Sequence, residues 1–220
     1  MTQRDVVVVE GPDAASFLQG QLAQDVAALP VGETALSFLL QPQGKVDALL
    51  RVRRAADDRF ELDVDAGYGE AVAQRLTRFK LRVKAEITVT GGVELPAPWG
   101  DGSRIAARWP AMGKELTEST IPAETGLVDR AVSFTKGCYT GQELVARIDS
   151  RGGNVPRHLR GLELAGDAPE GATIEVDGKE RGRITSVEGT DALAYVHRDV
   201  EPPAAAVVRW DGGETTARIL

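Results

Sequence analysis

The stretch Lys136-Gly137-Cys138-Tyr139-Thr140-Gly141-Gln142-Glu143 combines residue types that rarely occur together by chance. Its two glycines, four residues apart, permit unusual backbone angles or the close approach of a ligand to the main chain. Cys138 lies beside Lys136 and just before a helix that we expect to open at Gly141. A nearby cation and a helix N-terminus both favour thiolate over thiol, so an activated cysteine is predicted. The alternative, a small buried hydrophobic cysteine, stays open.

The residues before this stretch predict antiparallel strands. Apolar and polar residues alternate over 46–53 and over 60–65, and Asp57-Asp58 between them predicts the turn of a hairpin. A third strand is predicted over 34–40, a fourth over 81–90 and a short one over 104–108. Val132 and Phe134 read as the end of a further strand, and 112–119 as a short helix or loop.

Two helices are predicted from apolar spacing. After the turn Gly11-Pro12-Asp13, Leu18, Leu22 and Val26 recur every four residues and form one apolar stripe. The second helix covers 68–80 and should place Val72, Leu76 and Phe79 on one face. Antiparallel strands with helices packed against one face are an α+β arrangement, and that is the predicted fold class of the first part.

The last part of the chain predicts a β-barrel or sandwich. From about residue 157 onward, short apolar runs are separated by turn signals such as Asp177-Gly178. We therefore expect two domains, an α+β body over 1–153 and a small C-terminal barrel over 154–220. The Gly- and Pro-rich segment 91–102 is a possible internal junction.

Composition narrows the functional classes. The formal charge of −7 argues against electrostatic binding of nucleic acid over a wide surface. The longest early apolar run, Val6–Val9, is far too short to span a bilayer, so no membrane association is expected. A single cysteine forms no intramolecular disulfide, which predicts a reducing compartment such as the cytoplasm. One cysteine and two histidines cannot fill a four-ligand zinc or iron–sulfur shell, so no metal site is predicted.

The motif Lys-Gly-Cys-Tyr-x-Gly-Gln-Glu resembles the signature of the YgfZ family, relatives of the glycine-cleavage T-protein. The similarity continues, in chain order, at Phe17–Leu22, Gln41–Lys45, Ile121–Glu124 and Val145–Arg147. The resemblance implies α+β subdomains in a ring around a tetrahydrofolate site, followed by a C-terminal β-barrel. It also implies a role in sustaining iron–sulfur enzymes, including some that modify tRNA.

The resemblance also implies roles for individual residues. Cys138 would be the reactive or partner-contacting thiol and Lys136 its electrostatic neighbour. Because a client protein would reach this thiol from solvent, we expect Cys138 to be partly exposed. Tyr139 would pack or stack, Gln142 and Glu143 would form hydrogen bonds in the loop, and Arg147 would hold the loop or a ligand carboxylate.

A folate site makes specific chemical demands. The aminopyrimidine edge of a pterin suits a carboxylate, its flat rings need apolar walls, and its glutamate tail needs Arg or Lys. We assign the carboxylate that binds this pterin edge, which we call the pterin grip, to Glu124. The predicted folate-binding set is then Glu124, Tyr139, Gln142, Glu143 and Arg147.

The function predicted first is that of a tetrahydrofolate-binding accessory protein for iron–sulfur protein maturation or repair, with folate and client iron–sulfur proteins as partners. Whether it turns over a substrate is left open. The second hypothesis is an aminomethyltransferase-like enzyme that moves a one-carbon unit to tetrahydrofolate. The third is an interaction module without folate, which the short chain keeps open.

Overall fold

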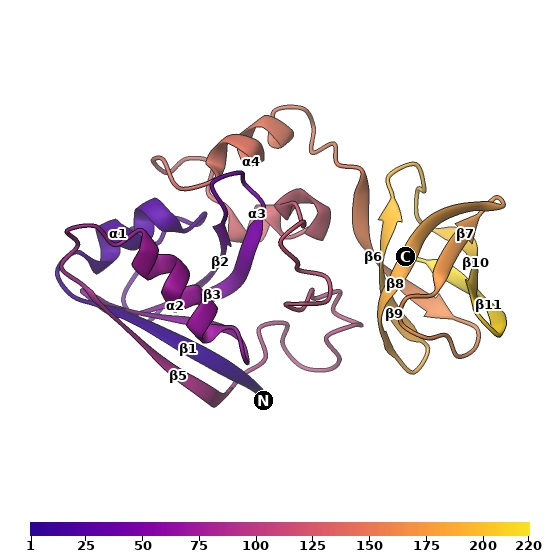
Figure 1. Cartoon of the computed structure of the whole chain (residues 1–220), viewed down its shortest axis with the longest axis horizontal. Coiled ribbons are helices and arrows are strands. Elements are labelled where there is room, and N and C mark those ends of the chain that lie inside the picture. Colours follow the sequence, from indigo (N-terminus) through magenta and orange to yellow (C-terminus); the bar gives the residue numbers. More distant parts are fainter.

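The computed structural model of the chain describes residues 1–220 and has two lobes. Figure 1 shows an α+β body that contains the N-terminus and a separate β-barrel that contains the C-terminus. The body holds a five-stranded antiparallel sheet, and the barrel closes with six strands. The predicted α+β class with a C-terminal barrel is confirmed. No helix is long and apolar enough to cross a membrane.

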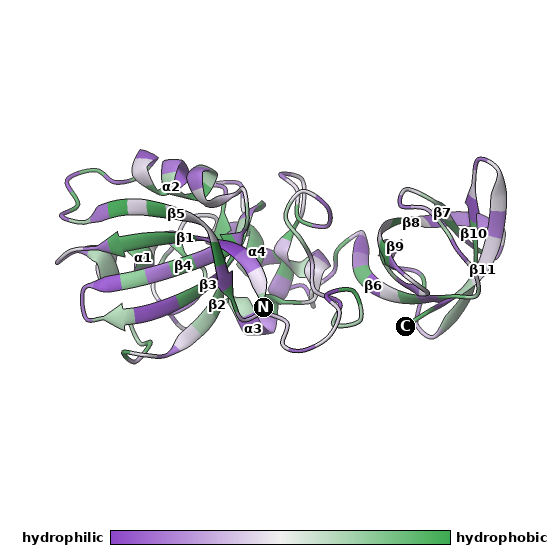
Figure 2. Ribbon diagram, turned by 90° about the horizontal axis from the view of Figure 1, so that it is seen from below, coloured by the Kyte–Doolittle hydropathy of each residue, from purple (hydrophilic) through white to green (hydrophobic).

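The sheet of the body has the strand order β2-β3-β4-β1-β5, which Figure 2 shows side by side. Its strands are β1 (Thr2–Glu10), β2 (Thr34–Leu40), β3 (Val46–Ala56), β4 (Arg59–Asp65) and β5 (Glu86–Leu95). Helices α1 (Ala14–Gln21) and α2 (Gly69–Arg78) cover one face of this sheet. Alternate strand residues point at the helices and form with them a core of 18 buried residues. The predicted hairpin β3–β4 is confirmed.

Both helices are shorter than their apolar patterns. Helix α1 ends at Gln21 because Leu22 adopts an extended backbone, yet Leu22 and Val26 are fully buried in the core. The apolar stripe is therefore real, although only its first part is helical. In α2, Val72 and Leu76 are buried as predicted, whereas Phe79 lies beyond the helix end and is 38% exposed.

Several predicted strands are wrong in extent or kind. Strand β5 begins at Glu86 rather than at 81, because Arg82 has a left-handed backbone that interrupts an extended segment. It then continues to Leu95, through the expected junction at 91–102. Residues 104–108 form turns instead of a strand, and Phe134 lies in a loop. The segment 112–119 is a loop with one isolated β-bridge.

A buried carboxylate explains why β5 passes through two glycines. Asp5 of β1 is 8% exposed and accepts hydrogen bonds from the amides of Gly67, Gly69 and Gly92, at 2.8, 2.9 and 3.1 Å. Gly92 has a positive φ of 67°, and the register of β1 with β5 shifts at this point, as in a β-bulge. Asp5 thus fastens the start of α2 and the bulge of β5 to the centre of the sheet.

The barrel has its own core. Its strands are β6 (Arg157–Leu164), β7 (Thr173–Val176), β8 (Lys179–Glu188), β9 (Asp191–His197), β10 (Ala204–Trp210) and β11 (Gly213–Ile219). They close in the order β10-β11-β6-β9-β8-β7 around 14 buried residues. The predicted domain boundary at 153/154 falls between the last helix of the body and β6.

The segment between body and barrel is held by a buried acid. Glu115 is fully buried, and its carboxylate accepts hydrogen bonds from Arg104 at 3.0 Å, from the Ala111 amide at 2.9 Å and from Ser186 of β8 at 2.6 Å. Its backbone carbonyl accepts the hydroxyl of Tyr195 of β9 at 2.9 Å. Burial alone would raise the pKa of Glu115, but these donors hold it below its ordinary value.

We predict that Asp5→Ala lowers the free energy of unfolding by about 2 kcal/mol at pH 7, because three amides lose a charged acceptor. Burial tends to raise the pKa of Asp5, but the bonds from Gly69, Gly92 and Gly67 outweigh it and lower the pKa. The folded-state pKa then lies below the unfolded value of about 3.9. The stabilisation is therefore complete above about pH 4 and is lost as the pH falls through the folded-state pKa.

Urea unfolding at pH 7 and pH 3 measures this difference. The matched control is Asp57→Ala, because the side chain of Asp57 is 93% exposed. A loss of stability that is equal at both pH values would contradict the role given to the ionised carboxylate.

Candidate functional site

The signature loop, residues 136–143, connects α3 (Val128–Ala131) to α4 (Gln142–Asp149). The predicted helix after Gly141 is confirmed, and Gly141 is its N-cap with φ of 83°. A side chain at Gly141 would place its Cβ 2.5 Å from the carbonyl oxygen of Gln41. On the opposite side, a Cβ on Gly44 would lie 2.5 Å from the Cβ of Leu144. Glycine at both positions lets the 41–45 loop press directly against the start of α4.

Lys136 fixes the other end of the signature loop. Its ammonium group donates to the carbonyl oxygens of Gln19, Leu22 and Gln24, at 2.6, 2.7 and 3.0 Å. Burial lowers the pKa of Lys136 to about 8, and the charge of Asp25 acts in the opposite direction. This ammonium therefore joins the signature loop to the chain that leaves α1. The predicted electrostatic effect of Lys136 on the Cys138 thiol stays a prediction.

Cys138 is exposed, as the sequence analysis expected. Gly137 beside it is also exposed, and Phe134 just before the loop is 47% exposed. The thiol thus occupies a short accessible stretch between the Lys136 anchor and the Gly141 contact. A partner can reach it without any rearrangement of the core.

The residues on either side of α4's start divide between core and surface. Tyr139 is 9% exposed, its ring lies 5.1 Å from the Lys136 ammonium, and burial raises its pKa to about 12. The side-chain oxygen of Gln142 accepts the Tyr139 amide at 3.2 Å, which closes the loop. Glu143 and Arg147 are exposed on α4. Of the predicted folate set, only these two face solvent freely.

Glu124 has structural partners. It lies in the short helix η1 (Pro122–Thr125), is 3% exposed, and accepts two hydrogen bonds from Arg157 of β6, at 3.0 and 3.3 Å. It also accepts the Ile121 amide at 3.1 Å. The Arg157 guanidinium lies 4.2 Å from the ring centroid of Tyr195. Glu124 therefore connects η1 to the barrel, and its role as pterin grip stays a prediction.

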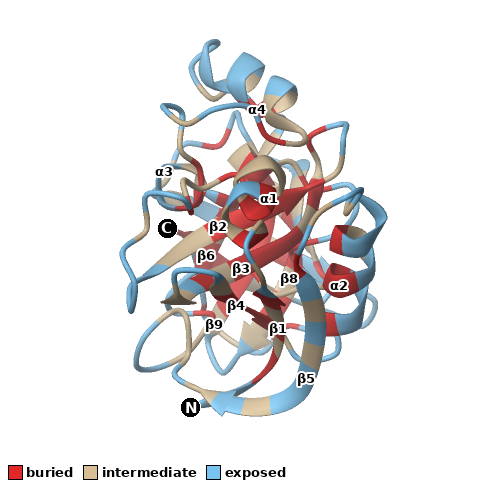
Figure 3. Cartoon of the chain, turned by 90° about the vertical axis from the view of Figure 1, so that its left-hand side faces the viewer, coloured by how far each residue is buried: buried red, intermediate tan, exposed pale blue.

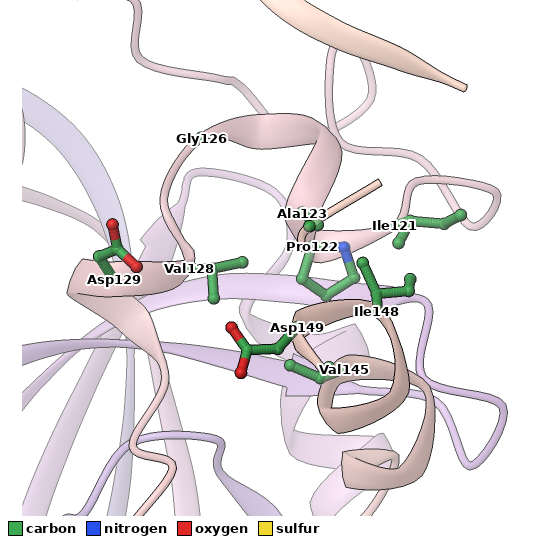
Figure 4. Close-up of a pocket in the computed structure, with 10 residues that line it drawn as sticks. Ile121, Pro122, Ala123, Gly126, Val128, Asp129, Val145, Ile148 and Asp149 are labelled. Atoms are coloured by element: carbon green, nitrogen blue, oxygen red, sulfur yellow. The ribbon is translucent and has the colours of Figure 1, made fainter. Parts of the chain in front are cut away.

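One cavity beside α4 lies between η1, α3 and α4. It has a volume of about 200 Å³, and none of the predicted site residues lines it. Figure 4 shows Val128 and Val145 within it, with the carboxylates of Asp129 and Asp149 beside them. The predicted folate set thus does not converge on this cavity.

A larger hollow, which we call the open-face trough, lies on the sheet face opposite α1 and α2. Its volume is about 610 Å³. It is lined by Val6, Val8, Thr34, Arg51, Arg53, Arg59, Glu61, Asp63, Thr90, Val93, Leu95 and Pro96. None of these was a predicted site residue. The signal was present in the alternation of β3 and β4, which places Arg51, Arg53, Glu61 and Asp63 on one face.

The charges of the open-face trough are paired with one another. Asp63 accepts hydrogen bonds from Arg4 at 2.9 Å and from Arg51 at 2.6 Å, and Arg4 also contacts Asp65. Glu61 accepts from Arg53 at 3.1 Å. The side chain of Arg53 is 53% exposed and that of Asp63 only 10%. The buried ion pair of Arg4 with Asp63 forms the floor of the trough. Arg53 and Glu61 remain accessible to a ligand.

Sequence relatives cover most of this chain. No family model matches it. It is 27% identical, over 89% of its length, to an uncharacterized protein of Haemophilus influenzae, of which it covers 86%. It is 30% identical, over 93% of its length, to the aminomethyltransferase of Thermus thermophilus, and 25% identical, over 69%, to the mitochondrial iron–sulfur cluster assembly factor IBA57 homolog of Pyricularia oryzae. The chain spans 54% of each of these two proteins.

A solved structure has the same fold. The crystal structure of the glycine cleavage system aminomethyltransferase T from Bartonella henselae matches 98% of this chain with a TM-score of 0.81. The match covers 82% of that protein at 19% sequence identity, a level at which the likeness shows the fold alone. Relatives and fold agree: the chain is similar in sequence to aminomethyltransferases and to iron–sulfur cluster assembly factors, and it has the fold of the glycine-cleavage T-protein structure.

Proposed function

We propose that this protein is a tetrahydrofolate-binding accessory factor for the maturation or repair of iron–sulfur proteins, including enzymes that modify tRNA. The observation that carries the proposal is an exposed thiol on a loop anchored at both ends, within a T-protein-like chain. Similarity to iron–sulfur cluster assembly factors supports it. We assign the function to the cytoplasm from the single cysteine, although the factors among the relatives are named as mitochondrial.

The open-face trough offers a hollow of suitable size, which the predicted set does not. Val6 and Val8 offer an apolar wall for a flat ring, and Arg53, once released from its pairing with Glu61, offers a cation to a glutamate tail. The volume lies within the usual range for small-molecule sites, about 300–1,000 Å³. Bound there, tetrahydrofolate would supply a nitrogen centre that accepts one-carbon units. The chain's own residues would bind and orient it.

A second candidate is an aminomethyltransferase-like enzyme. The observation in its favour is 30% identity to such an enzyme over most of this chain. Fold alone does not fix function, and the chain spans only about half of that relative. Formation of methylene-tetrahydrofolate from an aminomethylated carrier protein would support this candidate, and no product above background would remove it.

We predict saturable binding of tetrahydrofolate in an anaerobic calorimetric titration. Arg53→Ala should weaken binding about tenfold, because a charge-assisted hydrogen bond to the glutamate tail is lost. Arg218→Ala, on a barrel arginine that is 63% exposed, is the matched control. Glu124→Gln tests the earlier assignment of the pterin grip. Absence of binding would favour the folate-free interaction module, and an effect of Glu124→Gln alone would move the site to η1.

We predict that Cys138→Ala leaves folding and folate affinity unchanged but fails to restore iron–sulfur enzyme activity in cells that lack the factor. The thiol is exposed, so its removal leaves no cavity. Thermal unfolding and the same titration provide the controls. Full restoration of enzyme activity by this variant would rule out the role given to the thiol.

We predict that Lys136→Met destabilises the signature loop, because three carbonyl oxygens lose their donor at a cost of about 1–3 kcal/mol. Amide hydrogen exchange of 136–141 should accelerate. Cys138 is the only cysteine, so its alkylation by iodoacetamide reports on the thiol alone. The alkylation rate at one fixed pH is compared between the variant and the wild type, and Lys136→Arg tests whether another cation restores the loop. Exchange of 136–141 that is as slow as in the wild type would contradict the anchoring role of Lys136.

A further inference from the structure

The segment 78–84, which follows α2, is the most unusual part of the surface. Its sequence, Arg-Phe-Lys-Leu-Arg-Val-Lys, alternates cations with apolar residues in a chain whose net charge is −7. The structure has five exposed large hydrophobic residues, and two of them, Phe79 at 38% and Leu81 at 83%, lie here. We call this segment the basic tip. Figure 3 shows α2 with its buried and exposed sides, and the basic tip continues from its end.

No cation of the basic tip forms an ion pair. The ion pairs of the neighbouring elements are Arg75 with Asp47 and Arg59 with Glu10, and neither involves a residue of the tip. Burial lowers the pKa of Arg75, and the nearby charge of Arg78 lowers it further, which shows like charges in proximity. Four cations therefore face solvent beside two apolar side chains.

The base of the basic tip is rigid. The Lys84 amide donates to the Asp13 carboxylate at 2.8 Å, and the Lys84 carbonyl accepts the Asp13 amide at 3.2 Å. Ala85 is 5% exposed in the sheet core. A Cβ on Gly11 would lie 2.5 Å from the Lys84 carbonyl oxygen, so the two chains touch through a glycine. The tip therefore projects from a fixed frame.

The conformation of the tip itself is constrained as well. Arg82 has a φ of 57°, which costs a residue with a side chain about 1–2 kcal/mol. The Arg75 guanidinium lies 3.9 Å from the ring centroid of Phe79 and holds that ring at the surface. Strain and exposed apolar side chains that persist together are typical of binding segments.

We propose that the basic tip binds an acidic surface of a partner protein that also presents apolar side chains. On a nucleic-acid duplex the phosphates would satisfy the cations, but the bases are stacked inside and would leave Leu81 largely in water. An anionic bilayer would also meet Glu10, Asp58 and Glu86, which line one hollow together with Lys80 and Lys84. A protein partner can place its acids opposite individual cations and avoid these carboxylates. The inference stands apart from the proposed function.

A labelled peptide of four Glu-Leu repeats tests the proposal by fluorescence anisotropy with the full chain. We expect saturable binding that weakens with salt, because the contact is partly electrostatic. Leu81→Ser should weaken it about tenfold through lost apolar contact, and the double variant Lys80→Glu, Arg82→Glu by at least about tenfold through charge reversal. Val31→Ser, at another exposed apolar residue (53%), is the matched control.

Further binding measurements distinguish a protein partner from a lipid or nucleic-acid partner. A Glu-Ser peptide should bind more weakly than the Glu-Leu peptide, and a Lys-Leu peptide should not bind. Binding that is tighter to phosphatidylglycerol vesicles, or to a single-stranded oligonucleotide, with the same response to the variants would overturn the proposal in favour of a lipid or nucleic-acid surface. Peptide binding that is equal in wild type and variants would show that the tip is not the contact.

Discussion

The arrangement of the two lobes depends on one buried carboxylate. Glu115 belongs to the segment that leaves the sheet, yet Ser186 of β8 and Tyr195 of β9 bind its side chain and its carbonyl. An ionised group without solvent is tolerated only when its hydrogen-bonding capacity is filled, and Arg104 with the Ala111 amide completes that set. Moving the barrel away from the body would leave the carboxylate without Ser186 and the Glu115 carbonyl without Tyr195. The barrel is therefore fixed where η1 and Arg157 can also meet.

The signature loop shows the same principle on a smaller scale. A lysine at one end gives its protons to three carbonyls, and two glycines at the other end let main chains touch. Neither contact involves the thiol. The residues that make the motif recognisable are therefore mostly those that hold its shape, and Cys138 is the side chain that the shape leaves exposed. Such a division suits a loop that must present one group to a large partner.

How much the sequence could predict depends on how local the determining contacts are. The hairpin β3–β4, the helix after Gly141 and the barrel strands follow from alternation and turn residues within a few positions. The continuation of β5 to Leu95 could not be predicted, because Gly91-Gly92 resembles a break until Asp5, nearly ninety positions earlier, accepts the Gly92 amide.

The candidate site, too, was predictable only where its determining contacts are local in sequence. The accessible thiol was predictable from the motif, whereas the partners of Lys136 lie 112 to 117 residues away, so sequence proximity suggested a contact with Cys138 instead. Glu124 resembles a free carboxylate in the sequence because its partner Arg157 lies 33 positions away. The open-face trough was missed for another reason: alternating charges on a strand usually mark a solvated face, and only the sheet order shows that β3, β4 and β1 place theirs together.

The composition finally limits what the thiol can do for an iron–sulfur client. A cluster is held by four ligands, and this chain has one cysteine. Cys138 can supply at most one cysteine ligand or one transient sulfur bond, so in the proposed function the remaining ligands would come from the client or from another partner. A rigid, accessible loop is the structure that this chemistry requires, because the thiol must approach a site whose remaining geometry is set by the other protein.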